Sequence, residues 1–495
     1  MIYHVSPLGD DLQGNGTAVK PWNSVAYAAT QVAAGHTIRI EEGVYREFMS
    51  INLGVGVNLV GAGPDKTVLQ ADFPHAFLIR LISSSNEDGN QRISGFTIDG
   101  MNKQLQGGII VSGVNHVTLH DVDFVRCRMT GSLFTDNYRR LQKRGGEPKR
   151  YITGSNIHNC RYINSSGIGD RYVDGTKCGL AGNLMIAGLD GADIHHITIE
   201  DLGSPEDENG YGIKFWQDGY LKNVKIHDSF IRVKEYEDYW GANFSVELWN
   251  IGPGCEIYNI DCNTTLSLGT LEDAFQAKHT HDCNLKVHDC RVVSERLGGI
   301  PQTAVETGAS GTEVYNCYFE NFCGGVGFWH SHQEVCRNFY IHDNVFVIPE
   351  SIHGVRNERV QGLHAPWGMF FMLVGNYEHV RVTNNIFKGY GMGIRIGNVG
   401  ERTVDGFKHR DVVISGNRFI DTQEYLLRID SNDNDLISTD WYKKCLEQFV
   451  VEDNVSNRDV PWTYSSMPEI QARFDQLIMF KNNTIQHDLL ASKLP

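Results

Sequence analysis

The sequence predicts an all-β protein, a single right-handed parallel β-helix (a solenoid) with an N-terminal capping helix. The main observation is a short phrase that returns about every 27 to 40 residues. In this corner phrase, two or three alternating apolar residues precede a small polar pair, as in Val117–Asp121 and Val224–Asp228. Further copies are Ile257–Asn259, Val287–Asp289, Val314–Asn316, Ile341–Asn344, Val380–Asn385 and Val412–Asn417. A unit of this length cannot bury its inner face alone, so the copies are expected to stack.

Composition agrees with one long solenoid. The 495 residues include 52 glycines and 13 prolines, which suit many tight corners, and 41% of them are hydrophobic. Length alone would suggest about three domains, but a solenoid grows lengthwise without a larger core. No run of about 18 apolar residues is present, so no membrane span is predicted. The start, Met1–Val5, lacks the basic flank and apolar stretch of a signal peptide, so we expect a cytoplasmic protein or one whose leader has been removed.

Charge narrows the set of partners. The net charge of -16 argues against a nucleic-acid partner, because phosphate neutralisation needs clustered Lys and Arg. It also argues weakly against a strongly anionic polymer. One basic cluster falls within Arg139–Arg150, and it is either a solvated loop or an anion-binding lid.

The eleven cysteines show no zinc-type or disulfide spacing. Three of them take the corner position that asparagines occupy in other coils. They are Cys160, Cys290 and Cys317, and the asparagines are Asn344, Asn385, Asn417, Asn454 and Asn483. We expect all of these side chains to form one inward column with buried thiols.

In chain order, residues 1–48 are predicted to cap the solenoid. A helix is expected over Ser24–Ala33 with Ser24 as its N-cap. Coils follow, so that 49–495 form the β-helix with loop insertions, and a short helix is expected over Met467–Phe474. The ordered series Tyr3–Asp11, Gly14–Gly16, Lys20–Trp22, this helix and Gly35–Glu47 resembles the opening of carbohydrate-active β-helix proteins of the pectate-lyase-like superfamily. The resemblance implies the fold and a carbohydrate substrate.

Polar residues in the strands before the corner phrase are candidates for catalysis. The strands are expected in Ile213–Trp216, Ser245–Trp249, Phe275–His279, Ala304–Thr307 and Val326–His330. Because strand side chains alternate between faces, Lys214, Glu247, Lys278 and Glu306 should share one outward column. Glu247 and Glu306, two coils apart, would lie roughly 9 to 10 Å apart, close to the roughly 6.5 to 9.5 Å that separates the carboxyls of inverting glycosidases. Asp273 could supply a closer second carboxyl, and an ordinary surface ladder of ion pairs is the alternative.

Aromatic and imidazole side chains accompany these charges. Trp216, Trp249 and Trp329 are expected on the same face, where indole rings suit stacking on sugars. The pairs His279/His281 and His330/His332 could bind a metal. We favour hydrogen bonds to substrate hydroxyls or loop backbone, because no third clustered ligand is evident, and no metal site is predicted.

The segment Asp273–His279 resembles the core motif of the family six polysaccharide lyases. That resemblance implies Asp273 as a calcium ligand and Lys278 as the base that abstracts a proton from a uronic acid. This chain has Glu306 where those lyases carry an arginine, and a carboxylate there would repel a uronate.

We therefore expect a glycoside hydrolase with Glu247 and Glu306 as the carboxylate pair, supported by Lys278 and Asp273. Its partner would be a poly- or oligosaccharide, with no cofactor except calcium in the lyase alternative. A non-catalytic carbohydrate-binding solenoid is the third possibility, and both a monomer and a trimer are compatible with the sequence.

Overall fold

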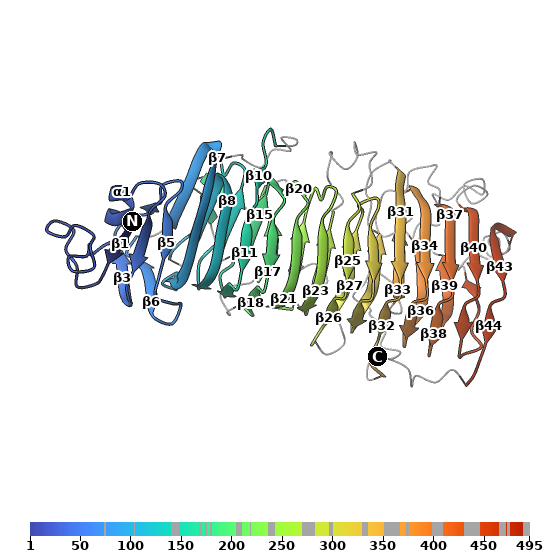
Figure 1. Cartoon of the computed structure of the whole chain (residues 1–495). Helices are drawn as coiled ribbons and strands as arrows, with labels where there is room; N and C mark the ends of the chain where they lie inside the picture. The colour runs from blue at the N-terminus through green and yellow to red at the C-terminus, as the bar shows by residue number, and fades with distance from the viewer. Residues whose placement is uncertain are drawn as a thin grey trace. The chain divides into compact units, whose positions relative to one another are not determined.

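The fold is described from a computed structural model of the chain (Figure 1). The described residues are 1–73, 76–102, 104–139, 148–167, 171–173, 176–178, 181–203, 210–217, 219–235, 243–269, 283–296, 300–328, 335–350, 367–372, 376–397, 409–429, 446–464, 472 and 476–488. The chain divides into two compact units, Met1–Lys234 with Asn243–Glu256, and Glu235–Ala242 with Ile257–Pro495. Within each unit the strands of successive coils pair in parallel. Each unit is therefore a right-handed parallel β-helix, the handedness that parallel crossovers adopt almost without exception.

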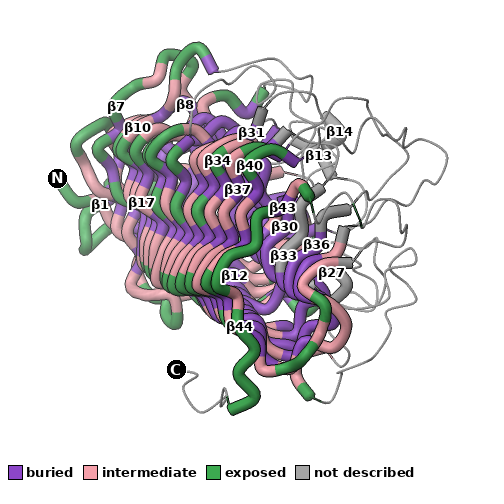
Figure 2. The backbone as a smooth tube through the Cα atoms, turned by 90° about the vertical axis from the view of Figure 1, so that its right-hand side faces the viewer, coloured by how far each residue is buried: buried purple, intermediate pink, exposed green. Residues whose placement is uncertain are grey.

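Each coil has three walls. The strand that carries the corner phrase belongs to the second wall, the strand after it to the third wall, and the strand before it to the first wall. Along the second-wall strands, for instance β17 (Asp193–His195) and β37 (His409–Ser415), buried residues alternate with more exposed ones (Figure 2). This alternation is the period of two that the sequence predicts.

The first unit begins with β1 (Ile2–Val5), α1 (Val25–Gln31), β2 (Thr37–Ile40), β3 (Gly43–Glu47), β4 (Ile51–Asn52), β5 (Asn58–Val60) and β6 (Thr67–Ala71). The long strands β7 (Phe77–Asp99) and β8 (Gly107–Val125) run through all three walls. The later first-wall strands are β9 (Thr130–Thr135), β15 (Leu184–Ala187), β19 (Ile213–Phe215) and β22 (Phe244–Leu248). The second and third walls contain β11 (Asn156–His158), β12 (Arg161–Ile163), β17, β18 (Thr198–Asp201) and β21 (Lys225–Val233).

Two smaller sheets accompany the coils of the first unit. The parallel strands β10 (Ile152–Thr153), β16 (Leu189–Asp190) and β20 (Leu221–Lys222) form one of them. The antiparallel pair β13 (Arg171–Val173) and β14 (Thr176–Cys178) forms the other. Both belong to the irregular part between Asp121 and Asp228, where the chain carries its long insertions.

The second unit repeats the same three walls. First-wall strands are β24 (Thr265–Leu268), β27 (Ile300–Thr307), β30 (Phe322–Phe328), β33 (Trp367–Met372), β36 (Met392–Gly397), β39 (Tyr425–Ile429) and β42 (Thr463–Tyr464). Second-wall strands are β23 (Glu256–Cys262), which continues into the third wall, β25 (Lys286–His288), β28 (Glu313–Tyr315), β31 (Val335–His342), β34 (Asn376–Thr383), β37, β40 (Leu446–Glu452) and β43 (Ile478–Lys481). Third-wall strands are β26 (Arg291–Val293), β29 (Tyr318–Glu320), β32 (Val345–Val347), β35 (Ile386–Lys388), β38 (Arg418–Ile420), β41 (Val455–Ser456) and β44 (Thr484–Ile485).

The polar residue that closes the corner phrase has a left-handed backbone. Asp121, Asp228, Asp289 and Asp343 have φ values of 52°, 49°, 54° and 55°. Asp and Asn tolerate this conformation better than other residues with a Cβ atom. The conformation turns the chain between the second and third walls, and this explains why the phrase repeats Asp or Asn at that place.

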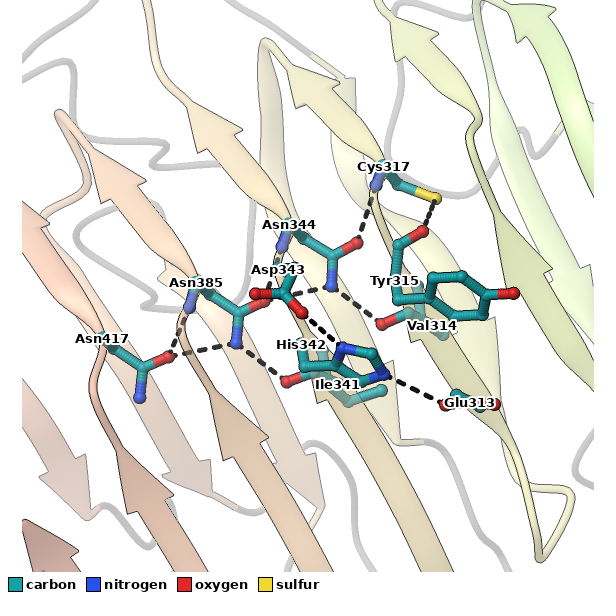
Figure 3. A network of polar contacts seen from close by, with 10 residues as sticks. All are labelled: Glu313, Val314, Tyr315, Cys317, Ile341, His342, Asp343, Asn344, Asn385 and Asn417. Carbon is teal, nitrogen blue, oxygen red and sulfur yellow. Dashed lines mark hydrogen bonds and ion pairs between the residues drawn. The ribbon is translucent and has the colours of Figure 1, made fainter. Parts of the chain in front are cut away.

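An inward ladder of asparagine and cysteine follows these corners in the second unit (Figure 3). The amide Nδ2 of Asn344 donates to Asn385 Oδ1 at 3.0 Å, and that of Asn385 donates to Asn417 Oδ1 at 3.0 Å. The pattern continues to Asn454 and Asn483, and the backbone N–H of Cys317 donates to Asn344 Oδ1 at 3.0 Å. The nine cysteines whose side chains the structure describes are free and buried. The predicted column is thus confirmed in the second unit, from Cys290 to Asn483. In the first unit the Cys160 thiol is also buried, and burial raises its pKa to about 12.

Outward ring ladders line the second wall. In the first unit the imidazoles of His120, His158, His195 and His227 stack with centroids 4.9 to 5.0 Å apart. In the second unit Tyr258, His288, Tyr315 and His342 stack in the same way. Figure 3 shows one end of this second ladder, where His342 contacts Asp343 and Glu313.

Helix α1 has the predicted start, with the Ser24 side chain accepting a hydrogen bond from Tyr27 N–H. The helix packs on β1 to β4 through Val25, Ala26, Ala28 and Ala29. Glu47 of β3 is buried, and its two carboxylate oxygens accept hydrogen bonds from Val25 N–H and Ala26 N–H at 2.8 and 3.0 Å. Burial raises the pKa of Glu47 even though these bonds oppose the shift.

The expectations for the C-terminal helix and for membrane spans concern the helices of the chain. The C-terminal helix expected over Met467–Phe474 lies outside the described residues except for Ala472. Among the described residues, every helix is too short or too polar to cross a lipid bilayer. The boundary placed at residue 48 between cap and coils stays a prediction.

Candidate functional site

The first wall of the first unit carries a buried pair of opposite charges. Lys214 on β19 lies directly opposite Glu247 on β22, and Ile213 lies opposite Val246. Ile213 and Val246 are fully buried in the core. Because strand residues alternate between faces, Lys214 and Glu247 project from the outward side. Their side chains form an ion pair and are only 8% and 10% exposed.

Aromatic rings surround the cationic end of this pair. Lys214 Nζ lies 4.2 Å from the centre of the Tyr211 ring and 5.0 Å from that of Phe215. Both rings present a face that attracts a cation. Replacement of a buried ion pair by well-packed apolar residues is often neutral or stabilising, so fold stability alone gives little reason to keep these charges.

Lys214 and Glu247 continue a column of outward residues, one from each coil of the first wall, and the change from apolar to charged residues in this column is abrupt. In the three coils before Lys214 the paired residues of the column are Ile110, Leu133 and Met185, and all three are buried. Lys214 follows Met185 directly. The outward face is therefore covered over these coils, and the charged pair begins where the apolar column ends.

The prediction that Trp216 faces substrate is wrong. Trp216 is only 3% exposed and belongs to an apolar cluster with Phe77, Met129, Tyr138 and Ala181. These residues come from the first wall itself and from the segments beside it, so the Trp216 side chain is enclosed by protein. The indole therefore contributes to packing and has no access to a sugar ring.

Trp249 has a different environment. It is half-buried and stacks on Phe215 with ring centroids 4.2 Å apart and planes 16° apart. Its indole N–H has no hydrogen-bond partner in the described part of the chain. A buried donor of this kind is uncommon, and it lies next in sequence to the strand that carries Glu247.

Glu306 belongs to the second unit. It lies on β27, is half-buried, and faces Ser267 on β24 in the preceding coil and Gly327 on β30 in the following one. The sequence alignment expected Lys278 in the coil beside Glu306, and this expectation is wrong because Ser267 has that position. Leu266, Ser267 and Leu268 alternate in polarity just as the segment Phe275–His279 does. They also lie closer in sequence to Cys262, the end of the preceding third-wall strand.

The remaining predicted residues cannot be placed. Asp273, Lys278, His279, His281, Trp329, His330 and His332 lie outside the described residues. Glu247 and Glu306 belong to different units, so their predicted separation stays a prediction. Within the described residues, no group of three or more His, Cys, Asp and Glu side chains is arranged to hold a metal ion, and the calcium implied at Asp273 is untested.

Sequence reasoning missed one half-buried carboxyl in the second unit. Glu235 accepts hydrogen bonds from Ser294 Oγ at 2.9 Å, Glu295 N–H at 2.9 Å and Asn263 Nδ2 at 3.2 Å. Burial raises its pKa although these hydrogen bonds act in the opposite direction. Asn263 and Ser294 lie between the third wall and the strands β24 and β27. Glu235 therefore holds in place the two turns that precede the strands carrying Ser267 and Glu306. No local pattern around Glu235 in the sequence indicates this role.

Comparison with family models and with curated proteins finds no match. Among solved structures, the chain is similar to pre-mature gene product 12 of bacteriophage phi29, with 14% identity over 86% of this chain and a TM-score of 0.47. The chain spans about half of that protein, 51% of its length. It is also similar to a mannuronic acid-specific family 6 polysaccharide lyase from human gut microbiota, with 14% identity, 96% and 94% of the two chains covered, and a TM-score of 0.44.

A third similar structure is the tailspike protein of E. coli bacteriophage HK620 in complex with a pentasaccharide. It shows 12% identity, a TM-score of 0.47, and coverage of 90% of this chain and 78% of the tailspike. Likenesses of this size assign no activity to this chain.

Proposed function

We propose that the protein is a glycoside hydrolase that acts on a poly- or oligosaccharide, with Glu247 and Glu306 as its two carboxylates. The observation that carries the proposal is the buried Lys214–Glu247 ion pair on the outward side of the first wall. Charged side chains that stability does not require are characteristic of functional sites.

The two carboxylates have different environments. Glu247 forms a buried ion pair with Lys214. Glu306 is half-buried and faces Ser267 and Gly327 in the two neighbouring coils. We propose that one of these carboxylates acts as the base and the other as the acid that protonates the leaving oxygen.

Substrate contacts are proposed on the same wall. Trp249 is the described aromatic residue whose half-buried ring and unpartnered indole N–H suit a sugar. Lys278, Asp273, Trp329 and the four histidines of the two His-x-His pairs remain candidates by sequence. Trp216 is not proposed to contact the substrate because it is buried in an apolar cluster.

The test is the release of reducing ends from a panel of plant and algal polysaccharides, followed together with the ultraviolet absorbance of unsaturated products. New reducing ends without that absorbance support hydrolysis. New reducing ends with the absorbance would instead indicate a lyase, and neither signal would indicate a binding protein. Both of these outcomes would overturn the proposal.

The variants that locate the reaction are Glu306→Gln and Glu247→Gln. Each should lower turnover by about 100- to 10,000-fold, the usual contribution of a general acid or base. A matched control is Glu256→Gln. Glu256 pairs with Lys225 at 3.4 Å, and the two side chains are 26% and 53% exposed, far more than those of Glu247 and Lys214. If Glu256→Gln lowers turnover as much as Glu247→Gln does, the assignment of Glu247 fails.

A further inference from the structure

The imidazole ladder of the first unit stops abruptly at one end. His158 lies opposite His120 on one side, while the residue opposite His120 on the other side is Ser94 of β7. The next coil has Val60 opposite Ser94. Among the described residues, His120 therefore has a ring neighbour on one face, 4.9 Å away, and no ring on the other.

An open hollow of about 520 Å³ lies where the next ring of the ladder would be. Gly61, Ser94, Gly95 and His120 are among the residues that line it. Two adjacent coils carry glycine beside the hollow and lie in close contact there: a Cβ atom on Gly61 would lie 2.1 Å from the carbonyl oxygen of Gly95. Gly61 N–H donates to Ser94 O at 2.8 Å, which holds the two coils in this close contact.

The hollow is also lined by polar side chains of both signs. Arg92 and Arg161 lie among Asp65, Asp121 and Asp123. Asp121 Oδ2 lies 2.6 Å from His120 Nδ1 and so orients the ring, and Arg161 Nη1 lies 3.4 Å from Asp123 Oδ2. A phosphate would meet three carboxylates in this place, and a cation would meet two guanidinium groups. Interspersed donors and acceptors suit a neutral ligand rich in hydroxyl groups.

We propose that this hollow binds a pyranose unit, with the apolar C–H face of the sugar on the free face of His120. The sugar would continue the ladder as its next ring, while Arg92, Asp65 and Asp121 bind its hydroxyls. The volume lies within the range of small-molecule sites, about 300 to 1,000 Å³. The site is formed by the second and third walls, apart from the first-wall residues Lys214 and Glu247, and its existence does not depend on the proposed hydrolysis.

The decisive experiment is saturation-transfer difference NMR of the full-length protein with the methyl glycosides of glucose, galactose, mannose and N-acetylglucosamine at millimolar concentrations. We expect saturation transfer to at least one of these glycosides. Ser94→His would add a ring at the free end of the ladder and should abolish the transfer. Arg92→Ala, a change at an exposed residue that leaves the fold intact, should weaken binding about tenfold, the effect of one hydrogen bond to a charged group.

The matched control is His195→Gln, which alters an interior position of the same ladder without touching the hollow, and it should keep the binding. Absence of transfer to all four glycosides would overturn the proposal, as would transfer that Ser94→His and Arg92→Ala leave unchanged. Binding of indole without binding of any glycoside would also overturn it.

Failure here can be distinguished from failure of the proposed hydrolysis. Ser94→His should retain turnover of polysaccharide, and Glu306→Gln should retain glycoside binding in the hollow. Loss of glycoside binding in Glu306→Gln would show that the observed ligand occupies the first wall, and would count against the hollow.

Discussion

Lys214 and Glu247 lie opposite each other on adjacent first-wall strands, and their charged groups pair where only 8% and 10% of the two side chains are exposed. Water cannot compensate either charge if its partner is removed. The pair should therefore respond to mutation in a way that separates fold from function.

Removal of one partner should be far more damaging to stability than removal of both. We expect Glu247→Leu or Lys214→Met alone to lower the free energy of unfolding by about 3–5 kcal/mol, because each leaves an uncompensated buried charge. The double variant should return to within about 1 kcal/mol of the parent protein. Urea denaturation of the four proteins measures this, and equal destabilisation by single and double changes would contradict the buried pair.

The double variant also provides a folded protein that lacks one of the two proposed catalytic carboxylates. It should lack polysaccharide turnover while it retains the parent's circular dichroism spectrum. Full turnover in this variant would remove Glu247 from the mechanism, whatever its effect on stability.

Trp216 should behave as a core residue. Trp216→Ala is expected to lower the free energy of unfolding by about 3–5 kcal/mol, since it removes a buried indole from the cluster with Met129 and Tyr138. Trp216→Phe should retain substrate affinity, measured as KM. An increase in KM for the Phe variant with unchanged stability would instead indicate a substrate contact.

The stability lost when an asparagine of the ladder is replaced should depend on the position of that residue in the ladder. Asn385→Ala leaves Asn344 N–H, Asn344 Nδ2 and Ile341 O without their partner, so we expect a loss of about 3 kcal/mol. Asn483 is the last member of the ladder and is half-buried, so water can replace its bonds, and Asn483→Ala should cost about 1 kcal/mol. Thermal unfolding of both variants gives the comparison; equal losses would argue against the ladder as a source of stability.

Acidification should weaken the imidazole ladder of the first unit. Burial lowers the pKa of His158 and of His195, and neighbouring imidazoles lower both further. A lowered folded-state pKa means that stability is present above the ordinary histidine pKa of about 6.5 and is lost as pH falls through the lowered value. Denaturation midpoints measured on both sides of that pH should decrease on acidification, and His158→Gln should reduce the decrease.

His342 is a control for this prediction, because its pKa is shifted in the opposite direction. Burial would lower its pKa, but hydrogen bonds with Asp343 and Glu313 outweigh burial, and the net shift is upward. Its contribution is therefore present below about pH 6.5 and is lost as pH rises through the raised value. A His342→Gln variant that reduces the acid sensitivity as His158→Gln does would show that the two ladders do not differ in this way.

Most of the fold could be predicted because its signals are local. The corner phrase carries the left-handed Asp or Asn of each turn, and the alternation of residues within it sets the inward and outward faces. The inward column of Cys317, Asn344 and Asn385 followed from their shared place after the corner. Ser24 predicted the start of α1 in the same way.

The candidate site was less predictable because it depends on which residues pair between neighbouring strands and on which chain segments cover the first wall. Phe275–His279 alternates in polarity as well as Leu266–Leu268 does, so local pattern could not select the strand beside Glu306. Outward direction did not imply exposure for Trp216, because Tyr138 and Ala181 come from insertions that cover the wall. The hollow beside His120 needed the pairing of Ser94 with His120, which no periodicity in the sequence reveals.

Glu47 has a consequence for the order in which the chain assembles. Its carboxylate on β3 receives two amide hydrogens from the start of α1, which is some twenty residues earlier in the chain. On the ribosome, where folding proceeds from the N-terminus, the helix emerges before the anion that anchors it. The opening coil thus closes only once residue 47 has been added, and from that moment it can serve as a template for every later turn of the growing polypeptide.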